Sequence, residues 1–235
     1  MKKILLTVYL LLLSAALFAQ VSSEEKKALL DFYTATNGAD WTHSWDTNEP
    51  VTNWQGVTVE ANKVVGIRLL FNNMEGALPQ SLGQLQHLRS LELSFNKLSG
   101  ELPKELGNLH KLEILSFNGN DLSGEIPASI GNLIHLQQLH LSSNHFSGQI
   151  PVELASLNKL TVFNVFDNKL SGALPLELAA NNNLRELVVA ENDFTNLADF
   201  PVVLLTNSGT LDLHQNNAAS KGKSVIAIET SDDDN

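Results

Sequence analysis

Asparagine recurs at a fixed step of 24 residues, and this period constrains the fold more than any other feature of the chain. The in-phase positions are Asn72, Asn96, Asn120, Asn144, Asn168, Asn192 and Asn216. Glycine keeps the same step at 76, 100, 124, 148 and 172, and proline keeps it at 79, 103, 127, 151 and 175. So many residues in phase exclude chance, and the chain is therefore an array of one repeating unit.

The leucine pattern within each period predicts a short strand that must pair with its copies. One period reads L-x-x-L-x-L-x-x-N-x-L-S-G-x-(L/I)-P-x-x-L-G-x-L-x-x-L. The L-x-L segment alternates apolar and polar residues, which is typical of a half-buried strand. A strand of this length is not stable alone, so successive units stack into a parallel sheet with strands about 4.8 Å apart.

The rest of the period predicts how the chain returns from one strand to the next. We expect each in-phase asparagine to pair with backbone groups that the turn leaves without partners, so that the six asparagines from Asn72 to Asn192 form a ladder. The S-G pair permits a bend. The proline ends any helix before it, and P-x-x-L-G-x-L predicts a short helical return on the convex side.

This period resembles the plant-type leucine-rich repeat of receptor-kinase ectodomains and polygalacturonase inhibitors, which also occurs in secreted bacterial proteins. The resemblance covers residues 63–196 and implies an α/β repeat solenoid. In such a solenoid the coils form a right-handed superhelix with a parallel β-sheet on the concave face. The chain contains neither cysteine nor an N-x-S/T sequon, which favours a bacterial exported member over a plant one.

The first nineteen residues predict an export signal. Lys2 and Lys3 precede an apolar stretch of residues 4–18, and Ala19 offers a small residue before a cleavage site. The stretch is shorter than the roughly 20 residues that span a bilayer. Residues 1–19 are therefore interpreted as a signal peptide. The mature chain is expected to be secreted, periplasmic or attached to the cell surface, without insertion into a membrane.

Residues 20–62 are expected to form a cap that covers the apolar end of the first coil. Ser22 followed by two glutamates predicts a helix start, and Thr36-Asn37-Gly38 predicts its end. All three tryptophans, Trp41, Trp45 and Trp54, follow within fourteen residues. The stretch resembles the N-terminal cap of the repeat family, where plant members usually carry a cysteine pair. We interpret the tryptophans as its packing; a sugar-binding aromatic platform is the functional alternative.

Residues 197–235 are interpreted as a degenerate repeat, a C-terminal cap and an acidic tail. Asparagine replaces the expected glycine at 196, and aspartate replaces the expected proline at 199. The apolar step continues through Leu211 and Leu213, which predicts a further strand there. The final Asp-Asp-Asp-Asn lacks the glycine and later glutamate of a calcium loop.

The sequence gives no motif for catalysis, a metal or a cofactor. The chain lacks cysteine, a G-x-S-x-G elbow and a phosphate-binding glycine loop. His135, His140 and His145 are five residues apart, but the period directs them to different sides of a coil. A net charge of −11 argues against nucleic acid as a partner. We therefore expect a protein without enzymatic activity, metal or cofactor.

The outward positions of the strands vary from coil to coil and predict a binding surface. Exposed apolar residues there, Ile114, Val162, Phe166 and Val188, exceed what a merely solvated face needs, although scattered exposed apolar residues are common. Phe71 and Phe95 form a separate aromatic pair near the first coils. The expected ligand-binding residues are Arg68, Glu92, Ile114, Gln138, His140, Val162, Asn164 and Phe166.

These features together predict a non-catalytic binding module that recognises a protein or peptide through the concave sheet. Polysaccharide binding, or inhibition of a secreted glycan-cleaving enzyme, is the alternative that the family resemblance implies. Binding to ice would require one polar residue type repeated over a flat face, and the outward columns are too mixed for that. The sequence does not identify the ligand, because the repeat specifies the frame and leaves the surface free.

Overall fold

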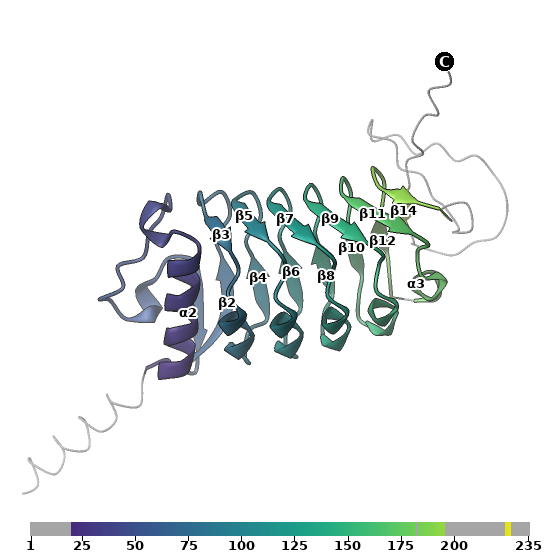
Figure 1. Cartoon of the computed structure of the whole chain (residues 1–235). Helices are drawn as coiled ribbons and strands as arrows, with labels where there is room; N and C mark the ends of the chain where they lie inside the picture. The colour runs from purple at the N-terminus through teal and green to yellow at the C-terminus, as the bar shows by residue number, and fades with distance from the viewer. Residues whose placement is uncertain (1–19, 182, 196–223, 227–235) are drawn as a thin grey trace, which may run out of the picture.

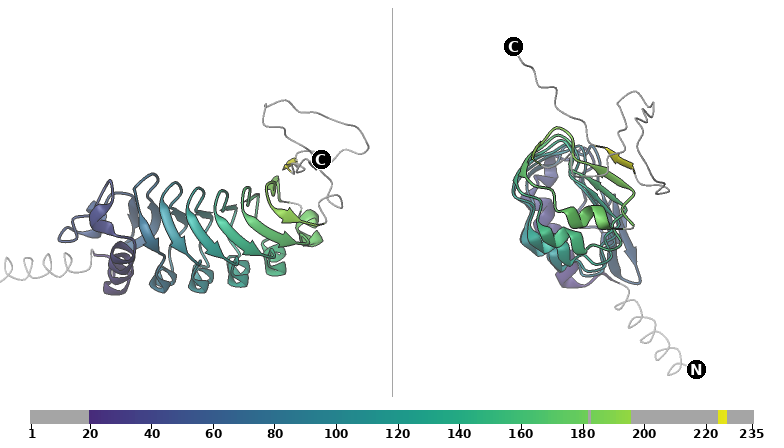
Figure 2. Two further views of the ribbon diagram at one scale, coloured as in Figure 1. Left: turned by 45° about the horizontal axis from the view of Figure 1, so that its top comes forward. Right: turned by 90° about the vertical axis from the view of Figure 1, so that its right-hand side faces the viewer.

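The computed structural model describes residues 20–181, 183–195 and 224–226 (Figure 1). The expected signal peptide, residues 1–19, lies outside this part of the chain, as does most of the expected C-terminal cap. Coils stack side by side in a single row, as the two views of Figure 2 show. The predicted leucine-rich repeat solenoid is confirmed by its parallel strands, its short helical returns and its N-terminal helix.

Eight strands form the main sheet, and the predicted L-x-L segments supply six of them. In spatial order they are β1 (Val57–Glu60), β2 (Lys63–Arg68), β4 (Ser90–Glu92), β6 (Ile114–Ser116), β8 (Gln138–His140), β10 (Val162–Asn164), β12 (Glu186–Val188) and β14 (Ser224–Ile226). Ile67 pairs with Leu91, and Leu91 pairs with Leu115. The register is therefore one period from coil to coil. Among the described strands, only β1 pairs with its neighbour, β2, in the antiparallel direction.

A second sheet follows the asparagines, where the sequence predicted only a bend. Its strands are β3 (Glu75–Ala77), β5 (Lys97–Gly100), β7 (Asp121–Gly124), β9 (His145–Gly148), β11 (Lys169–Gly172) and β13 (Asp193–Phe194). Ser99 pairs with Asp121 and Ser147 with Lys169, so neighbouring positions differ by 22 residues. The period does not show this, because it fixes equivalent positions and not which of them pair.

The returns on the opposite side of each coil are short helices that begin directly after a proline. They are the 3-10 helices η3 (Gln80–Gln84), η4 (Lys104–Asn108), η5 (Ala128–Asn132) and η6 (Val152–Ser156), and the α-helix α3 (Leu176–Ala180). Pro103 caps η4 in an extended conformation, which ends the preceding segment as predicted. Leucines of the strands and of the returns meet inside each coil and make one continuous core.

The in-phase asparagines link consecutive coils through buried amides. Asn120 Nδ2 donates to the carbonyls of Leu93 at 3.1 Å and Phe117 at 2.9 Å, one in the preceding coil and one in its own. Its Oδ1 accepts from the N–H of Leu98 at 3.0 Å. Asn96, Asn144, Asn168 and Asn192 donate and accept in the equivalent way.

Asn72 occupies the first rung of this series and differs from the others. Its Oδ1 accepts from the N–H of His43 in the cap at 2.7 Å. Its Nδ2 is buried and has no hydrogen-bond partner among the described residues. The difference follows from the architecture, because no leucine-rich coil precedes Asn72 to offer a carbonyl.

The N-terminal cap consists of the helix α2 (Ser23–Ala35), the short helices η1 (Gly38–Asp40) and η2 (Val51–Asn53), and three tryptophans, of which Trp41 and Trp45 contact Phe32 of α2. Trp45 stacks on Trp54 with ring centroids 4.7 Å apart and meets Trp41 edge-on at 4.9 Å. All three rings are buried. The tryptophans therefore form the interior of the cap, and an exposed sugar-binding platform made from them is excluded.

Glu25 of α2 is buried and joins the cap to the first repeat strand, which the sequence did not predict. Ser22 caps the helix by accepting from the N–H of Glu25 at 3.2 Å, and its hydroxyl donates to Glu25 Oε2 at 3.1 Å. Glu25 Oε1 accepts from the N–H of Val64 in β2 at 3.3 Å, and Lys63 Nζ lies 3.8 Å from Oε2. One carboxylate thus serves both the helix and the sheet.

The strand beside β12 is not the one that the period predicts. A step of 24 residues places residues 210–212 next to Glu186–Val188, but β14 (Ser224–Ile226) pairs there. The expectation of an in-phase strand at that place is therefore wrong. Residues 210–214 and Asn216 lie outside the described residues. Positions 196 and 199, where the period loses its glycine and proline, also lie outside the described residues.

Candidate functional site

The predicted ligand-binding residues lie on the outward side of the main sheet. Ile114, Gln138 and Val162 are direct neighbours on adjacent strands, and His140 is paired with Asn164 in the next column. Each is half-buried, as expected for side chains that line a sheet and face solvent. These residues therefore share one surface. Arg68 and Glu92 extend it toward the first coils.

Arg68 and Glu92 form an ion pair on this surface. Arg68 Nη1 lies 2.5 Å from Glu92 Oε2, and the Ser90 hydroxyl donates to Glu92 Oε1 at 2.7 Å. The side chain of Arg68 is 65% exposed, whereas that of Glu92 is 18% exposed. An exposed pair of this kind contributes only about 0–1 kcal/mol to stability. Its main effect is to hold the carboxylate and leave the outer side of the guanidinium accessible.

His140 is the titratable group at the centre of the sheet surface. Its Nε2 lies 3.2 Å from Gln138 Oε1. Burial lowers the pKa of His140 below its ordinary value of 6.5, and the carboxylates of Glu186 and Glu92 act in the opposite direction. The imidazole is therefore neutral at pH 7. A neutral imidazole has one donor and one acceptor nitrogen, and because Nε2 contacts Gln138, Nδ1 is the nitrogen left for a ligand.

The apolar part of the surface is smaller than the sequence predicted. Ile114, Val162 and Phe166 remain half-buried on the outward side. Val188 is 8% exposed, so its prediction as an outward apolar residue is wrong. The strand that carries it, β12, has a neighbour on each side, β10 and β14. Ile114 and Val162 flank Gln138 on the two neighbouring strands. Phe166 follows β10, where its N–H donates to Asn164 Oδ1 at 3.0 Å.

A column of residues with a left-handed backbone conformation runs beside this surface, and only its two phenylalanines were singled out from the sequence. It consists of the residues just before the in-phase asparagines: Phe71, Phe95, Gly119, Ser143, Asp167 and Glu191, with φ between +52° and +62°. We call it the left-handed column. This backbone conformation costs a residue other than glycine about 1–2 kcal/mol. No sequence pattern reveals it, because five different residue types occupy the six positions.

Two phenylalanines of the left-handed column are the most unusual exposed residues of the repeats. Phe71 is 67% exposed and Phe95 is 49% exposed. Their rings stack with centroids 4.5 Å apart and planes 6° from parallel. Neither belongs to the buried core. Bulky residues are rare in the left-handed region, so this pair is an outlier that packing of the core does not explain.

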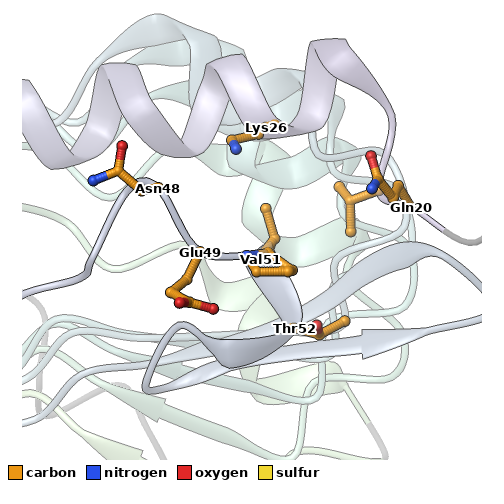
Figure 3. Close-up of a pocket in the computed structure, with 8 residues that line it drawn as sticks. Gln20, Lys26, Asn48, Glu49, Val51 and Thr52 are labelled. Carbon is orange, nitrogen blue, oxygen red and sulfur yellow. The ribbon is translucent and has the colours of Figure 1, made fainter.

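A pocket with a volume of about 170 Å³ lies at the N-terminal cap, away from the sheet surface (Figure 3). It lies between the start of α2 and the segment around Val51, with Lys26 and Glu49 at its wall. Lys26 Nζ also lies 5.7 Å from the centre of the Trp54 ring. The pocket brings together no nucleophile and base, so it offers no arrangement for catalysis.

No metal site emerges from the histidines that are five residues apart. His140 contacts Gln138, His135 Nδ1 lies 2.8 Å from Lys159 Nζ, and His145 lies 3.9 Å from Asp121. Within residues 20–181, 183–195 and 224–226, no three acidic or histidine side chains group as metal ligands do. None of the helices in that part of the chain has the length and apolar character to cross a bilayer.

A repeated serine on the second sheet does not make the uniform ladder that an ice-binding face requires. Serine recurs at 99, 123, 147 and 171. The 22-residue register sets Ser99 opposite Asp121, Ser123 opposite His145 and Ser147 opposite Lys169. Each hydroxyl therefore has a charged or imidazole neighbour. The surface alternates in chemistry along the row of coils.

Several solved structures resemble this chain. The complex of PEPR1 with AtPEP1 matches with a TM-score of 0.67 and 29% identity, over 72% of this chain and 25% of that one. The BIR2 ectodomain from Arabidopsis thaliana matches with a TM-score of 0.66 and 26% identity, over 78% and 99% of the two chains. A plant ice-binding protein matches with a TM-score of 0.67 and 25% identity, over 74% and 58%.

The chain spans about a quarter of the length of PEPR1. No curated protein matches the sequence. The fold is shared with plant receptor ectodomains as well as with the ice-binding protein, and it is consistent with a module that binds a protein or a peptide. The protein-family model described as a leucine-rich repeat region matches residues 63–206, which is more than half of the chain. Together with the stacked coils, the parallel sheet and the asparagine rungs, this match shows that the chain belongs to the leucine-rich repeat family.

Proposed function

We propose that this protein is an exported, non-catalytic binding module that recognises a protein or peptide through the outward side of its main sheet. One observation carries the proposal: chemically different side chains share a single rigid surface. Ile114 and Val162 offer apolar contacts beside the neutral His140. An interface core combines apolar contact with a few placed polar groups in this way.

The rigidity of the frame supports the proposal. Each strand of the surface is only three residues long in β4, β6, β8 and β10, but its neighbours hold it on both sides. The side chains behind it, such as Leu115 and Leu139, are completely buried. Binding therefore requires little ordering of the surface, and a preorganised surface loses less affinity to ordering. The resemblance to the PEPR1 complex with AtPEP1 is a second support.

The test has two arms, a glycan array and affinity capture from the extracellular medium in which the protein is produced. The identified partner is then titrated against the variant His140→Ala/Phe166→Ala. We expect a captured protein or peptide whose affinity falls about tenfold or more. The matched control is Ile134→Ser, which removes an exposed apolar side chain after η5, away from the sheet surface.

The outcomes separate the candidate functions. A partner that binds the sheet variant and the wild type equally would overturn the proposed surface. Binding only on the glycan array would instead favour the polysaccharide alternative. Loss of activity of a captured glycan hydrolase would favour the inhibitor alternative. Equal binding of a partner to the control and to the wild type is required in every case.

A further inference from the structure

The left-handed column changes in chemistry along the row of coils. Its first two members are the stacked phenylalanines. Gly119 and the half-buried Ser143 follow, and the exposed Asp167 and Glu191 complete it. One edge of the main sheet therefore carries an aromatic end and an acidic end.

The backbone of this column is held by the sheet, and its side chains are free to differ. The N–H of Phe95 donates to the carbonyl of Asn118 at 2.7 Å, and the N–H of Gly119 donates to that of Ser142 at 2.9 Å. Phe71 and Asp167 make the equivalent bonds to Ser94 and Ala190. The next coil thus imposes the left-handed conformation, whichever residue occupies the position.

Phenylalanine is among the least suitable residues for such a position. Glycine, asparagine and aspartate adopt positive φ more readily than an aromatic residue does. The two rings also leave much of their surface in water without contributing to the core. Their mutual stacking offsets only part of this double disadvantage. The disadvantage points to a contact that the free protein does not contain.

The glycine at the next position of the column, Gly119, leaves room for the ring of Phe95. A Cβ built on Gly119 would lie 2.8 Å from Cδ1 of Phe95, so any other residue would displace the ring. Phe71, Phe95 and the backbone of Gly119 therefore form one continuous stack. Both phenylalanines are largely exposed to solvent. They offer a firm apolar contact to a partner.

The acidic end is free for a partner of opposite charge. Among the described residues, neither Asp167 nor Glu191 takes part in an ion pair. Both are exposed, and their column lies beside Phe166 of the sheet surface. A lysine or arginine of a partner would therefore pair here without breaking an existing contact.

We propose that the left-handed column binds an extended peptide segment that carries an aromatic or large aliphatic residue at one end and a lysine or arginine at the other. Adjacent coils are about 4.8 Å apart, so Phe95 and Asp167 are about 14 Å apart and Phe71 and Glu191 about 24 Å. An extended chain rises about 3.3 Å per residue. The two anchors of the ligand are therefore four to seven residues apart. This inference rests on the proposed peptide-binding function and names its ligand chemistry.

The probe is a displayed library of random linear dodecapeptides, selected against the full chain. The strongest peptide is then titrated by fluorescence anisotropy against two double variants. Phe71→Asn/Phe95→Asn removes the rings and installs a residue that tolerates positive φ. Asp167→Asn/Glu191→Gln removes both charges and keeps the shape. We expect selected peptides with the two anchors at the stated spacing, and an affinity about tenfold lower or more for each variant.

A stability measurement separates binding from a structural role. The variant Phe71→Asn/Phe95→Asn should melt at the same temperature as the wild type or higher, because it relieves two strained aromatic positions. A lower melting temperature would show that the pair serves the fold and would overturn the proposal. Selection of no peptide, or of peptides without the two anchors, would also overturn it.

The same titration distinguishes this column from the sheet surface. Peptides that bind both double variants normally but lose affinity for His140→Ala/Phe166→Ala would contradict the left-handed column and leave the proposed function intact. Peptides that depend on the column but not on the sheet variant would support the column as the principal site. A peptide with its anchors moved to adjacent positions is the spacing control and should bind weakly.

Discussion

The N-terminal cap and the repeat array hold their interiors together in different ways. In the cap, a few large residues make many contacts each, and Trp45 touches four other aromatic rings. In the array, many small contributions recur, such as one leucine pair and one asparagine rung in every coil. The cap should therefore depend on single residues, whereas the array should lose stability in repeated, similar increments.

Both regions hold their chain segments in place without disulfides, because the chain contains no cysteine. The buried indole N–H groups of Trp41, Trp45 and Trp54 all donate to backbone carbonyls, at 2.7, 2.8 and 3.0 Å. These bonds fix irregular chain segments that a disulfide would otherwise hold. The asparagine amides do the same for the regular turns of the array. In both regions, therefore, these buried polar side chains pair with backbone groups.

The largest effect is expected for Trp45→Ala. The substitution empties the centre of the aromatic cluster, and we expect a loss of about 3–5 kcal/mol in the free energy of unfolding. Circular dichroism with urea measures it. Trp45→Phe is the matched control and should lose less, because it keeps a ring at the site. A loss below about 1 kcal/mol for the alanine variant would refute the dependence of the cap on this residue.

The second comparison sets an inner rung of the ladder against its first rung. Asn120→Ala leaves the buried N–H of Leu98 without its partner and removes one of the two amide donors to each of the carbonyls of Leu93 and Phe117, so we expect a loss of about 2–4 kcal/mol. Asn72→Ala removes only the bond to His43 and also removes an unsatisfied donor, so we expect about 1 kcal/mol or less. Equal losses in urea unfolding would contradict the difference between the rungs.

The junction between the two regions is tested by Glu25→Ala. The variant leaves the buried N–H of Val64 unpaired and removes the ion pair with Lys63, so we expect a loss of about 1–3 kcal/mol. Glu24→Ala is the matched control, because Glu24 occupies the same helix turn but is exposed. It should lose only about 0.3–1 kcal/mol. Tryptophan fluorescence, which reports the cap alone, should show the change at the same urea concentration as circular dichroism.

The smallest effect is a pH dependence within the array. The pKa of His140 is lower in the folded protein than its ordinary 6.5 because of burial. The unfolded chain therefore binds more protons just below pH 6.5, and this group's contribution to stability is complete above that pH and declines as the pH falls. The variant His140→Gln should reduce the stability difference between pH 7.5 and pH 5.5. An identical difference in both proteins would show that His140 does not contribute.

The repeat made most of the array predictable, and it left the sheet surface and the column incompletely predicted. Leu91, Leu115 and Leu139 could be assigned to the interior because they recur in phase. The positions of Arg68, His140 and Phe166 on one surface followed from the same step. The exposure of Phe71 and Phe95 also followed from it, whereas the burial of Val188 and the left-handed backbone of the two phenylalanines did not, because contacts between neighbouring coils decide both.

The sequence by itself determined the leucine-rich repeat family, the repeating coil and the asparagine rungs that link the coils. It could do so because a fixed period repeats the same nearest-neighbour contact from one unit to the next. The tertiary structure alone decided three further features: the 22-residue register of the second sheet, the burial of Glu25 against Val64, and the left-handed column. Each depends on which backbone groups of one segment face those of another. That pairing is fixed only when the coils stack, and no spacing within one chain segment encodes it.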